Sequence, residues 1–418
     1  MPSLSDKLKS LGVRLGPADL PSPHPRSQTV NLLEALGVHP ISTLVGDTFI
    51  LDQYFPAGHI HGRAPLNVSA SLNTLANWVG DARLRELPAQ AFAFLDTETT
   101  GLQGGTGTFA FLIGVGRFEG DTFHLAQFFM QDPAAEPAQL AALEAYLAPC
   151  QALVTYNGKA FDIPLLNTRY ISHGLTIPYN GYAHVDLLHL ARRLWRDRLP
   201  SRTLSNIEAQ ILGSLRTSDD VPGWMIPQLY FDYLRSGDPA PLKSVFYHNA
   251  MDVVSLAALL NHTAGLLENP LSAEVQHGID MISLAKLFED LGDLAMATRL
   301  YIHGMRHLEA QDAGSSMDIY LQAIQRLAAI YKRQGNYPAA VELWQEAAAN
   351  RHLDSNIELA KYYEHRLRDV PTAIYWTRTA ILTLEGLDLH QHLRQVWLAE
   401  LEHRLERLKR KHTGQETE

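Results

Sequence analysis

A short apolar run that ends in two acidic residues is the feature of this chain that most limits its fold. Residues 91–100 read AFAFLDTETT, so an unbroken apolar stretch leads directly into Asp96 and Glu98. Such a run is typical of a buried strand, in which side chains alternate between the two faces, so Asp96 and Glu98 share one face. Paired carboxylates can bind Mg²⁺ or Mn²⁺, hard ions that prefer oxygen ligands. The alternative is an exposed strand edge with solvated acids, but acids that end a buried run are costly without partners.

The residues after this strand predict an α/β domain with a mixed sheet and flanking helices. The segments FAFLIGVGRFEG and TFHLAQFFMQ read as two strands joined by a hairpin at Gly120 and Asp121. A helix over 134–147, a buried strand ALVTYNG, a helix FDIPLLNTRYISHG and the segment HVDLLHLARRLW follow. This order is an α/β pattern that begins with an antiparallel meander.

Two further segments place acidic residues where they can join the first pair. In YNGKAFD, Asn157 and Asp162 flank a glycine-containing turn that directs Asp162 toward the same end of the sheet. A helix N-cap is the alternative for Asp162. In YHNAMD, His248 and Asp252 are four residues apart on a predicted helix and share a face, where the imidazole can take a proton from water while the carboxylate holds metal. A surface histidine is the alternative for His248.

These segments resemble the motifs of the DEDD exonucleases, a ribonuclease H-like group. DTETTGL is similar to the first motif and NGKAFD to the second. In the third motif the family has either histidine with four residues before its aspartate or tyrosine with three. Here His248 stands at the spacing usual for tyrosine, and Tyr247 at the spacing usual for histidine. We favour His248 as the group that assists the attacking water, because an ordinary histidine pKa of about 6.5 suits proton abstraction near neutral pH.

The resemblance implies phosphodiester hydrolysis of nucleic acid, DNA or RNA, from the 3′ end. Two divalent cations, Mg²⁺ or Mn²⁺, would be held by Asp96, Glu98, Asp162 and Asp252, and His248 completes the catalytic set. The Thr-Gly segment that follows the two acids would lie against the terminal nucleotide, and Lys159 is a candidate for phosphate contact because it lies within the second motif. The expected substrate-binding residues are Thr97, Thr99, Thr100, Gly101, Leu102, Asn157, Lys159 and Tyr247.

Residues 90–267 resemble more closely the YprB-type ribonuclease H-like proteins, which can also carry tetratricopeptide repeats. The similar segments include HVDLLHLARRLWRDRLPSRTLSNIEAQILG, VPGWMIPQLYFDYLRSGD and HNAMDVVSL. Asp186 in the first of these is expected to cap the following helix rather than bind metal. The same segment carries a basic cluster that could either track a phosphate backbone or form a solvated face paired with Asp197 and Glu208, and its members are Arg192, Arg193, Arg196, Arg198 and Arg202.

Residues beyond Pro270 are expected to form an all-α domain of helical repeats. Small and aromatic residues recur at identical offsets in two units, first as Ala285, Phe288, Gly292, Ala297, Tyr301 and Gly304, then as Ala328, Tyr331, Gly335, Ala340, Trp344 and Ala347. A third unit has Leu367 in place of the glycine, and its later alanines fall one position late. These offsets resemble those of tetratricopeptide helix pairs, and an ordinary helical bundle is the alternative. The expected division is an irregular lead-in over 1–90 that packs on the nuclease domain, a ribonuclease H-like domain over 91–268 and tetratricopeptide-like repeats over 271–412.

Composition narrows the function further. The single cysteine, Cys150, excludes an internal disulfide framework and a zinc site built on several thiolates. No apolar run reaches the roughly 20 residues of a spanning helix, so we expect a cytoplasmic chain without membrane contact. The net charge of −10 argues against wrapping of nucleic acid by bulk electrostatics. We therefore expect a 3′–5′ exonuclease with a protein-binding repeat module, and the alternatives are a nuclease-fold scaffold that binds nucleic acid or protein and a structure-selective endonuclease.

Overall fold

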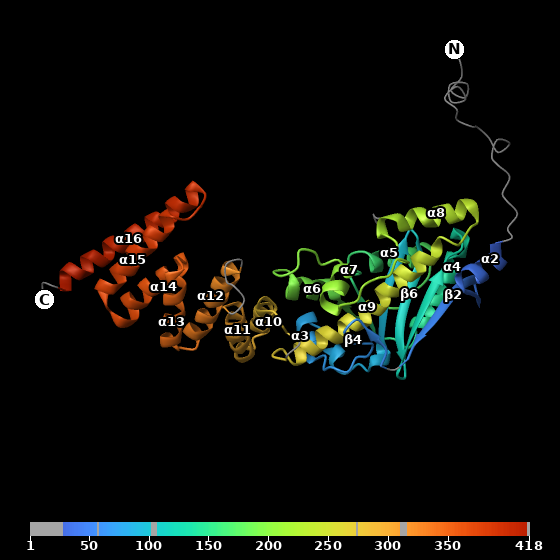
Figure 1. Ribbon diagram of the computed structural model, residues 1–418, viewed down its shortest axis with the longest axis horizontal. Coiled ribbons are helices and arrows are strands. Elements are labelled where there is room, and N and C mark those ends of the chain that lie inside the picture. Colours follow the sequence, from blue (N-terminus) through green and yellow to red (C-terminus); the bar gives the residue numbers. More distant parts are fainter. Residues whose placement is uncertain (1–27, 57, 102–106, 273–274, 310–315, 416–418) are drawn as a thin grey trace, which may run out of the picture.

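The computed structural model describes residues 28–56, 58–101, 107–272, 275–309 and 316–415. An α/β part comes first along the chain, and an elongated all-helical part extends away from it (Figure 1). This arrangement confirms the predicted fold class. Leu102 and residues 1–27 of the predicted lead-in lie outside the described residues.

One mixed sheet of seven strands organises the α/β part. Its strands in spatial order are β1 (His39–Thr43), β2 (Gly46–Phe55), β7 (Thr122–Phe129), β6 (Ala110–Glu119), β5 (Phe92–Thr99), β8 (Ala152–Thr155) and β9 (Ala183–Asp186). Strands β5, β8 and β9 run parallel, whereas every other neighbouring pair is antiparallel. Strands β1 and β2 come from the first ninety residues, and β2 pairs with both β1 and β7, so that region extends the sheet itself.

The two faces of the sheet bury different side chains of β5. Ala93 and Leu95 pack in the core that includes α4 (Glu136–Leu147) and α5 (Asp162–Ser172), whereas Phe92 and Phe94 pack in the core that includes α9 (Leu242–Glu268). Because side chains alternate along a strand, the side chains of Asp96 and Glu98 continue the α9 face, and that of Thr97 continues the α5 face. The central strand is thus placed between two layers of helices.

Helix α9 runs the length of the sheet (Figure 1). Its 27 residues are apolar enough to cross a membrane by length and composition, although no unbroken apolar run suggested this. However, 78% of its most apolar window is buried inside the fold, as in the core helix of a globular domain. The remaining elements of this part are α2 (Gln28–Leu36), β3 (Ile60–His61), β4 (Ala64–Pro65), α3 (Asn73–Val79), α6 (Leu187–Trp195), α7 (Leu204–Ile207) and α8 (Ile226–Ser236).

Consecutive helices of the C-terminal part pack in pairs joined by short turns. The helices are α10 (Gly278–Asp290), α11 (Leu294–Glu309), α12 (Met317–Arg333), α13 (Tyr337–Ala349), α14 (Leu353–Tyr362), α15 (Val370–Glu385) and α16 (Gln391–Gln415). Gly292 and Gly335 turn the first two pairs with left-handed φ angles of 84° and 77°. In the third pair a π-helical turn over Tyr363–Leu367 absorbs one extra residue, and Arg368 takes the left-handed position with φ 55°. This insertion explains why the later alanines of the third unit fall one position late.

The two parts share a continuous core and are bridged by ion pairs. Met281 and Ala285 of α10 belong to the same buried cluster as Trp195 of α6. Arg198 binds Asp280 at 2.8 Å and Lys286 binds Asp197 at 3.0 Å. Within the predicted basic cluster, Arg193 also pairs with Asp290 of α10, and Arg202 donates to backbone carbonyls at 2.9 and 3.1 Å. Arg193 and Arg198 therefore bind α10 at the junction. Arg196 pairs with Asp197 at 3.5 Å, as one of the two interpretations expected, whereas Glu208 pairs with Arg216.

Candidate active site

The two acids of β5 lie at its carboxyl end, against α9. Asp96 pairs in register with Gly114 of β6, and the register shifts by a β-bulge just after Glu98. The side chain of Asn249 on α9 donates to Oδ2 of Asp96 at 2.9 Å, and the side chain of Gln127 on β7 donates to Oδ1 of Asn249 at 2.9 Å. Asn249 and Gln127 are fully buried, so the orientation of Asp96 is fixed by a hydrogen-bonded chain from a third strand.

Asp162 is the first residue of α5 and reaches β5 from the other side. Thr97 donates a hydrogen bond of 2.5 Å from Oγ1 to Oδ1 of Asp162. The turn before α5 is held by Asp186, whose carboxylate accepts from the backbone N–H groups of Asn157 at 2.8 Å and Lys159 at 3.1 Å. Asn157 adopts a left-handed φ of 66°. Asp186 also caps α6, as the sequence predicted, by accepting from the backbone N–H of Leu188.

Glu98, His248 and Asp252 form the tightest group of possible metal ligands among the described residues. One ligand atom from each lies within 4.8 Å of the others. His248 and Asp252 stand on the same face of α9, with Nε2 of the histidine 3.6 Å from Oδ2 of the aspartate. The group therefore joins β5 to α9 at the end of the sheet where Asp96 also lies.

An arginine that was not among the predicted site residues lies at the centre of the site. Arg216, in the loop before α8, binds the buried Glu208 through two hydrogen bonds of 2.7 Å. The same guanidinium contacts Oδ1 of Asp252. Glu208 thus anchors Arg216, and Arg216 balances part of the charge of Asp252. The only signal in the sequence was the charged stretch LRTSDD, which gives no indication of where the loop folds.

His248 is oriented by a second missed residue. Its Nδ1 lies 2.7 Å from Oδ1 of Asp220 and 3.1 Å from Nη1 of Arg216. The shorter contact indicates that Nδ1–H donates to Asp220, which leaves Nε2 as the basic nitrogen facing Asp252. Tyr247 is turned elsewhere, since its hydroxyl accepts from the backbone N–H of Thr217 at 3.1 Å.

A cavity of about 600 Å³ opens beside the acids, and Asp96 and Asp162 both line it. The wall also includes several predicted substrate-binding residues, namely Thr97, Thr99, Gly101 and Asn157. Phe161, which is 55% exposed, lines the cavity as well and was not among the predicted site residues.

The hydroxyl groups of Thr99 and Thr100, two predicted substrate-binding residues, form hydrogen bonds within the protein. The Thr99 hydroxyl donates to the carbonyl of Gly101 at 2.8 Å, and the Thr100 hydroxyl accepts from the backbone N–H of Phe109 at 3.0 Å. Lys159 is exposed and does not line the cavity. These threonine hydroxyls therefore help to hold the backbone next to Gly101, which lines the cavity.

The carboxylates are held in an environment that disfavours their charge. Burial, followed by the charges of Asp252 and Glu98, raises the pKa of Asp96 well above its ordinary value. Burial and the neighbouring acids likewise raise the pKa of Glu98. Burial raises the pKa of Asp162 to about 6, although the hydrogen bond from Thr97 opposes the change. A bound divalent cation would offset this repulsion, and the oxygen-rich donor set suits a hard ion.

Comparison with known proteins agrees with this architecture. Residues 93–264 match the family model of the RNase H superfamily. The chain is also 32% identical over 353 residues to the protein described as uncharacterized protein YprB of Bacillus subtilis (strain 168), and the match covers 82% of each chain. The chain belongs to the YprB family of the RNase H superfamily. Membership of this nuclease superfamily supports a role in nucleic acid hydrolysis.

Proposed function

We propose that the protein is a metal-dependent nuclease that removes nucleotides from the 3′ end of nucleic acid. The observation that carries this proposal is the meeting of acids from three separate elements: Glu98 of β5 lies close to Asp252 of α9, and Asp96 of β5 lines one cavity with Asp162 of α5. Clustered carboxylates with raised pKa values are unfavourable in a purely structural role, which argues against a scaffold that has lost its activity. They are expected where a protein binds cations.

The residues that would hold two divalent cations, Mg²⁺ or Mn²⁺, are Asp96, Glu98, Asp162 and Asp252. When bound, such ions supply positive charge that stabilises the attacking and leaving oxygens of a phosphodiester. Two of the proposed metal ligands are already held in place by hydrogen bonds from neighbouring side chains. Asn249 fixes Asp96, and Thr97 fixes Asp162, so neither carboxylate must reorient when cations bind.

His248 is proposed as the base that takes a proton from the attacking water. Asp220 accepts from Nδ1, which keeps Nε2 free to accept that proton and stabilises the resulting imidazolium. Arg216 adds a fixed positive charge next to His248 and Asp252, in the region where the phosphate would carry negative charge. Glu208 keeps this guanidinium in place when Asp252 binds a cation.

The cavity supports an exonuclease over a structure-selective endonuclease. Its volume of about 600 Å³ suits one terminal nucleotide rather than a continuous duplex. Phe161 offers an exposed ring on which the terminal base could stack, next to the Asp162 carboxylate. Base stacking of this kind is tolerant of sequence, which fits an enzyme that shortens strands of any sequence.

The polarity of cleavage can be tested with single-stranded DNA and RNA labelled at either end, in the presence of Mn²⁺. A ladder of shortening products from 5′-labelled strands, with release of the label as a mononucleotide from 3′-labelled strands, is the expected result. Cleavage of a circular single strand would instead assign an endonuclease. An Asp96→Asn chain purified in the same way controls for contaminating nucleases, and equal degradation by that chain would contradict the proposal.

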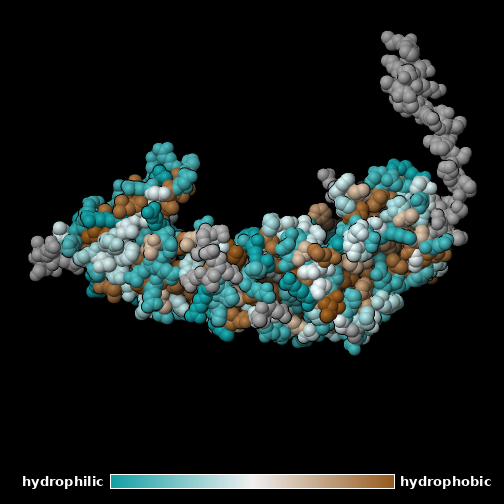
Figure 2. Space-filling model, viewed as in Figure 1, coloured by the Kyte–Doolittle hydropathy of each residue, from teal (hydrophilic) through white to brown (hydrophobic). Residues whose placement is uncertain are grey.

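We also propose that the helical part binds a protein partner. Its last two helices expose large apolar side chains, including Tyr375 at 60% and Leu382 at 69%. Figure 2 shows hydrophobic side chains at the surface of this end of the molecule. Chemical crosslinking in cells should trap a partner with the parent chain, and Tyr375→Lys combined with Leu382→Lys should abolish that product. An unchanged product would contradict this assignment.

A further inference from the structure

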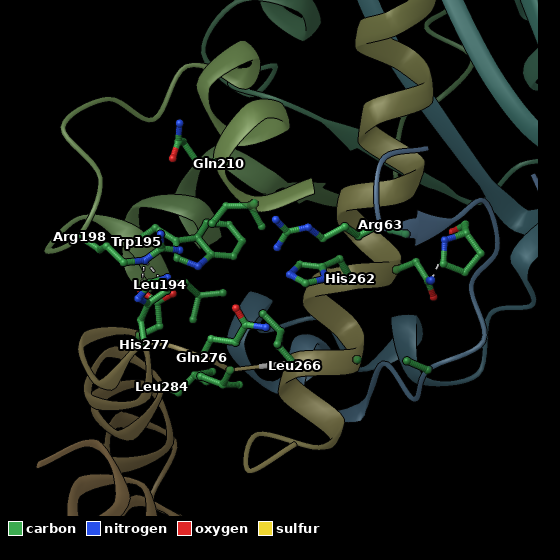
Figure 3. Close-up of a pocket in the computed structure, with 18 of the residues that line it drawn as sticks. Arg63, Leu194, Trp195, Arg198, Gln210, His262, Leu266, Gln276, His277 and Leu284 are labelled. Atoms are coloured by element: carbon green, nitrogen blue, oxygen red, sulfur yellow. Dashed lines mark hydrogen bonds and ion pairs between the residues drawn. The ribbon is translucent and has the colours of Figure 1, made fainter. Parts of the chain in front are cut away.

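A second cavity lies at the junction of the two parts, between α6, α9, α10 and the segment that contains β4 (Figure 3). Its volume of about 410 Å³ is in the range of small-molecule sites. Leu194, Leu266 and Leu284 supply apolar walls, and polar side chains from both parts of the chain surround them. None of the proposed metal ligands lines this cavity.

A glycine in the last turn of α9 borders this space. Gly265 lines the cavity, and a Cβ added at this position would meet no atom within 4 Å. Because no close packing inside the protein requires this glycine, its effect on the structure is to leave room in the cavity.

Arg63 is positioned at the cavity by the turn at Gly62, which packs closely against the backbone of Leu212. A side chain at Gly62 would come within 2.1 Å of the carbonyl oxygen of Leu212, and the Arg63 backbone N–H donates to that oxygen at 2.7 Å. Figure 3 shows the Arg63 side chain extending toward His262. Within the described part of the chain, the guanidinium of Arg63 and the side-chain amides of Gln210 and Gln276 have no hydrogen-bond partner.

The lining favours an anion that carries a flat ring. His262 lines the cavity, and the buried ring of Trp195 supports it from behind, with the two rings within 23° of parallel and their centroids 6.5 Å apart. Arg198 and Asp280 neutralise one another, so the remaining fixed charge in the lining is that of Arg63. A phosphate group would pair with Arg63, and a heterocycle with hydrogen-bonding edges would meet the glutamine amides.

We propose that this junction cavity binds a free nucleoside 5′-monophosphate. The phosphate binds Arg63, and the base lies against the ring of His262. The binding itself does not depend on the proposed nuclease reaction, although a mononucleotide is what that reaction would release. Because α6, α9 and α10 all line the cavity, the bound nucleotide couples the two parts of the chain.

The test uses full-length protein carrying Asp96→Asn, in EDTA, so that no cations and no turnover contribute. Isothermal titration with AMP, dAMP, adenosine and inorganic phosphate measures which portion of the nucleotide is recognised. We expect binding of at least one monophosphate, with affinity at least about tenfold lower for Arg63→Gln and for Gly265→Leu. A Cβ at residue 265 would meet no atom within 4 Å. Arg192→Gln and Gly223→Leu are matched controls, because both sites are exposed and neither lines the cavity.

The proposal would be overturned by the absence of binding, or by equal binding to the parent and the Gly265→Leu chain. Equal affinity for inorganic phosphate and the monophosphates would contradict recognition of the ring. Tighter binding of a 5′-phosphorylated oligonucleotide, lost in the same two variants, would assign the cavity to a strand end and contradict a free nucleotide. A change in thermal stability caused by the variants alone is measured separately without ligand.

Discussion

Asn249 on α9 donates a hydrogen bond of 2.9 Å to Oδ2 of Asp96 on β5. This contact requires a glycine beneath it, because a Cβ at Gly114 would lie 2.2 Å from Oδ1 of Asn249. The absence of a side chain at Gly114 therefore allows the helix to approach the strand closely enough to hold a metal ligand.

Replacing that glycine should disturb catalysis more than it disturbs the fold. In Gly114→Ala the Asn249 amide must move, and a displacement of about 1 Å at Asp96 can lower turnover by about 100-fold. Nuclease rate and circular dichroism measured on the same sample check this expectation. Gly223→Ala has no neighbour within 4 Å and serves as the control. Unchanged turnover in Gly114→Ala would show that the Asn249 contact is dispensable.

The orientation of His248 and Tyr247 leads to opposite expectations for their variants. His248→Ala removes the proposed base, so turnover should fall by about 100-fold or more, while Mn²⁺ affinity falls much less. Tyr247→Phe removes only a hydroxyl that accepts from Thr217, so its turnover should be close to that of the parent. Asp220→Asn should lower turnover by weakening the orientation of His248. A larger loss in Tyr247→Phe than in His248→Ala would assign the base to the tyrosine.

Arg216 should contribute strongly to the stability of the cation-free protein. Arg216→Gln leaves the buried Glu208 without its bidentate partner and removes positive charge from Asp252. Breaking a buried pair in this way costs about 3 kcal/mol. Arg235→Gln, which breaks an exposed pair with Asp232, should cost less than about 1 kcal/mol. Denaturant unfolding in EDTA measures the free energy of unfolding of both variants. A similar decrease in Arg216→Gln and Arg235→Gln would contradict the proposed role of Arg216.

The raised pKa of Asp162 predicts how stability depends on pH without cations. The folded pKa of about 6 lies above the ordinary value of 3.8, so the folded state binds the proton more tightly than the unfolded chain does. The stabilising effect of that proton is present below about pH 4 and is lost as the pH rises through about 6. Asp162→Asn, which can keep the hydrogen bond from Thr97, should therefore be more stable than the parent by about 3 kcal/mol at pH 7 to 8, but not at pH 4. Melting temperatures in EDTA across this range measure the effect, and an identical pH profile for both chains would contradict it.

The relative orientation of site residues that are close together in the sequence could be predicted, because the regular geometry of a strand or a helix fixes it. Alternation along a strand placed Asp96 and Glu98 on one face, and helical spacing placed His248 next to Asp252. The capping role of Asp186 followed from its place before an apolar helix, and its side chain also holds the turn that carries Asn157.

The missed residues depend on where loops and distant elements fold. Arg216 reaches the site only because its loop passes over α9, and Asp220 reaches His248 across 28 residues of sequence. Strand β2 falls in the segment predicted to be an irregular lead-in, since its pairing partner β7 lies about 75 residues away along the chain. Buried partners such as Gln127 carry no sequence signal for their roles, because neutral amides also occur on exposed strands.

Mn²⁺ binding, counted by electron paramagnetic resonance on the parent chain and on Glu98→Gln, tests the central claim most directly. Our account predicts two Mn²⁺ sites in the parent chain, and affinity at least about tenfold lower in Glu98→Gln because a ligand has been removed. Lys159→Gln, at an exposed residue outside the cavity, should bind Mn²⁺ as the parent does. A parent chain that binds no Mn²⁺ at millimolar concentration, or a Glu98→Gln chain that binds it equally well, would contradict the account.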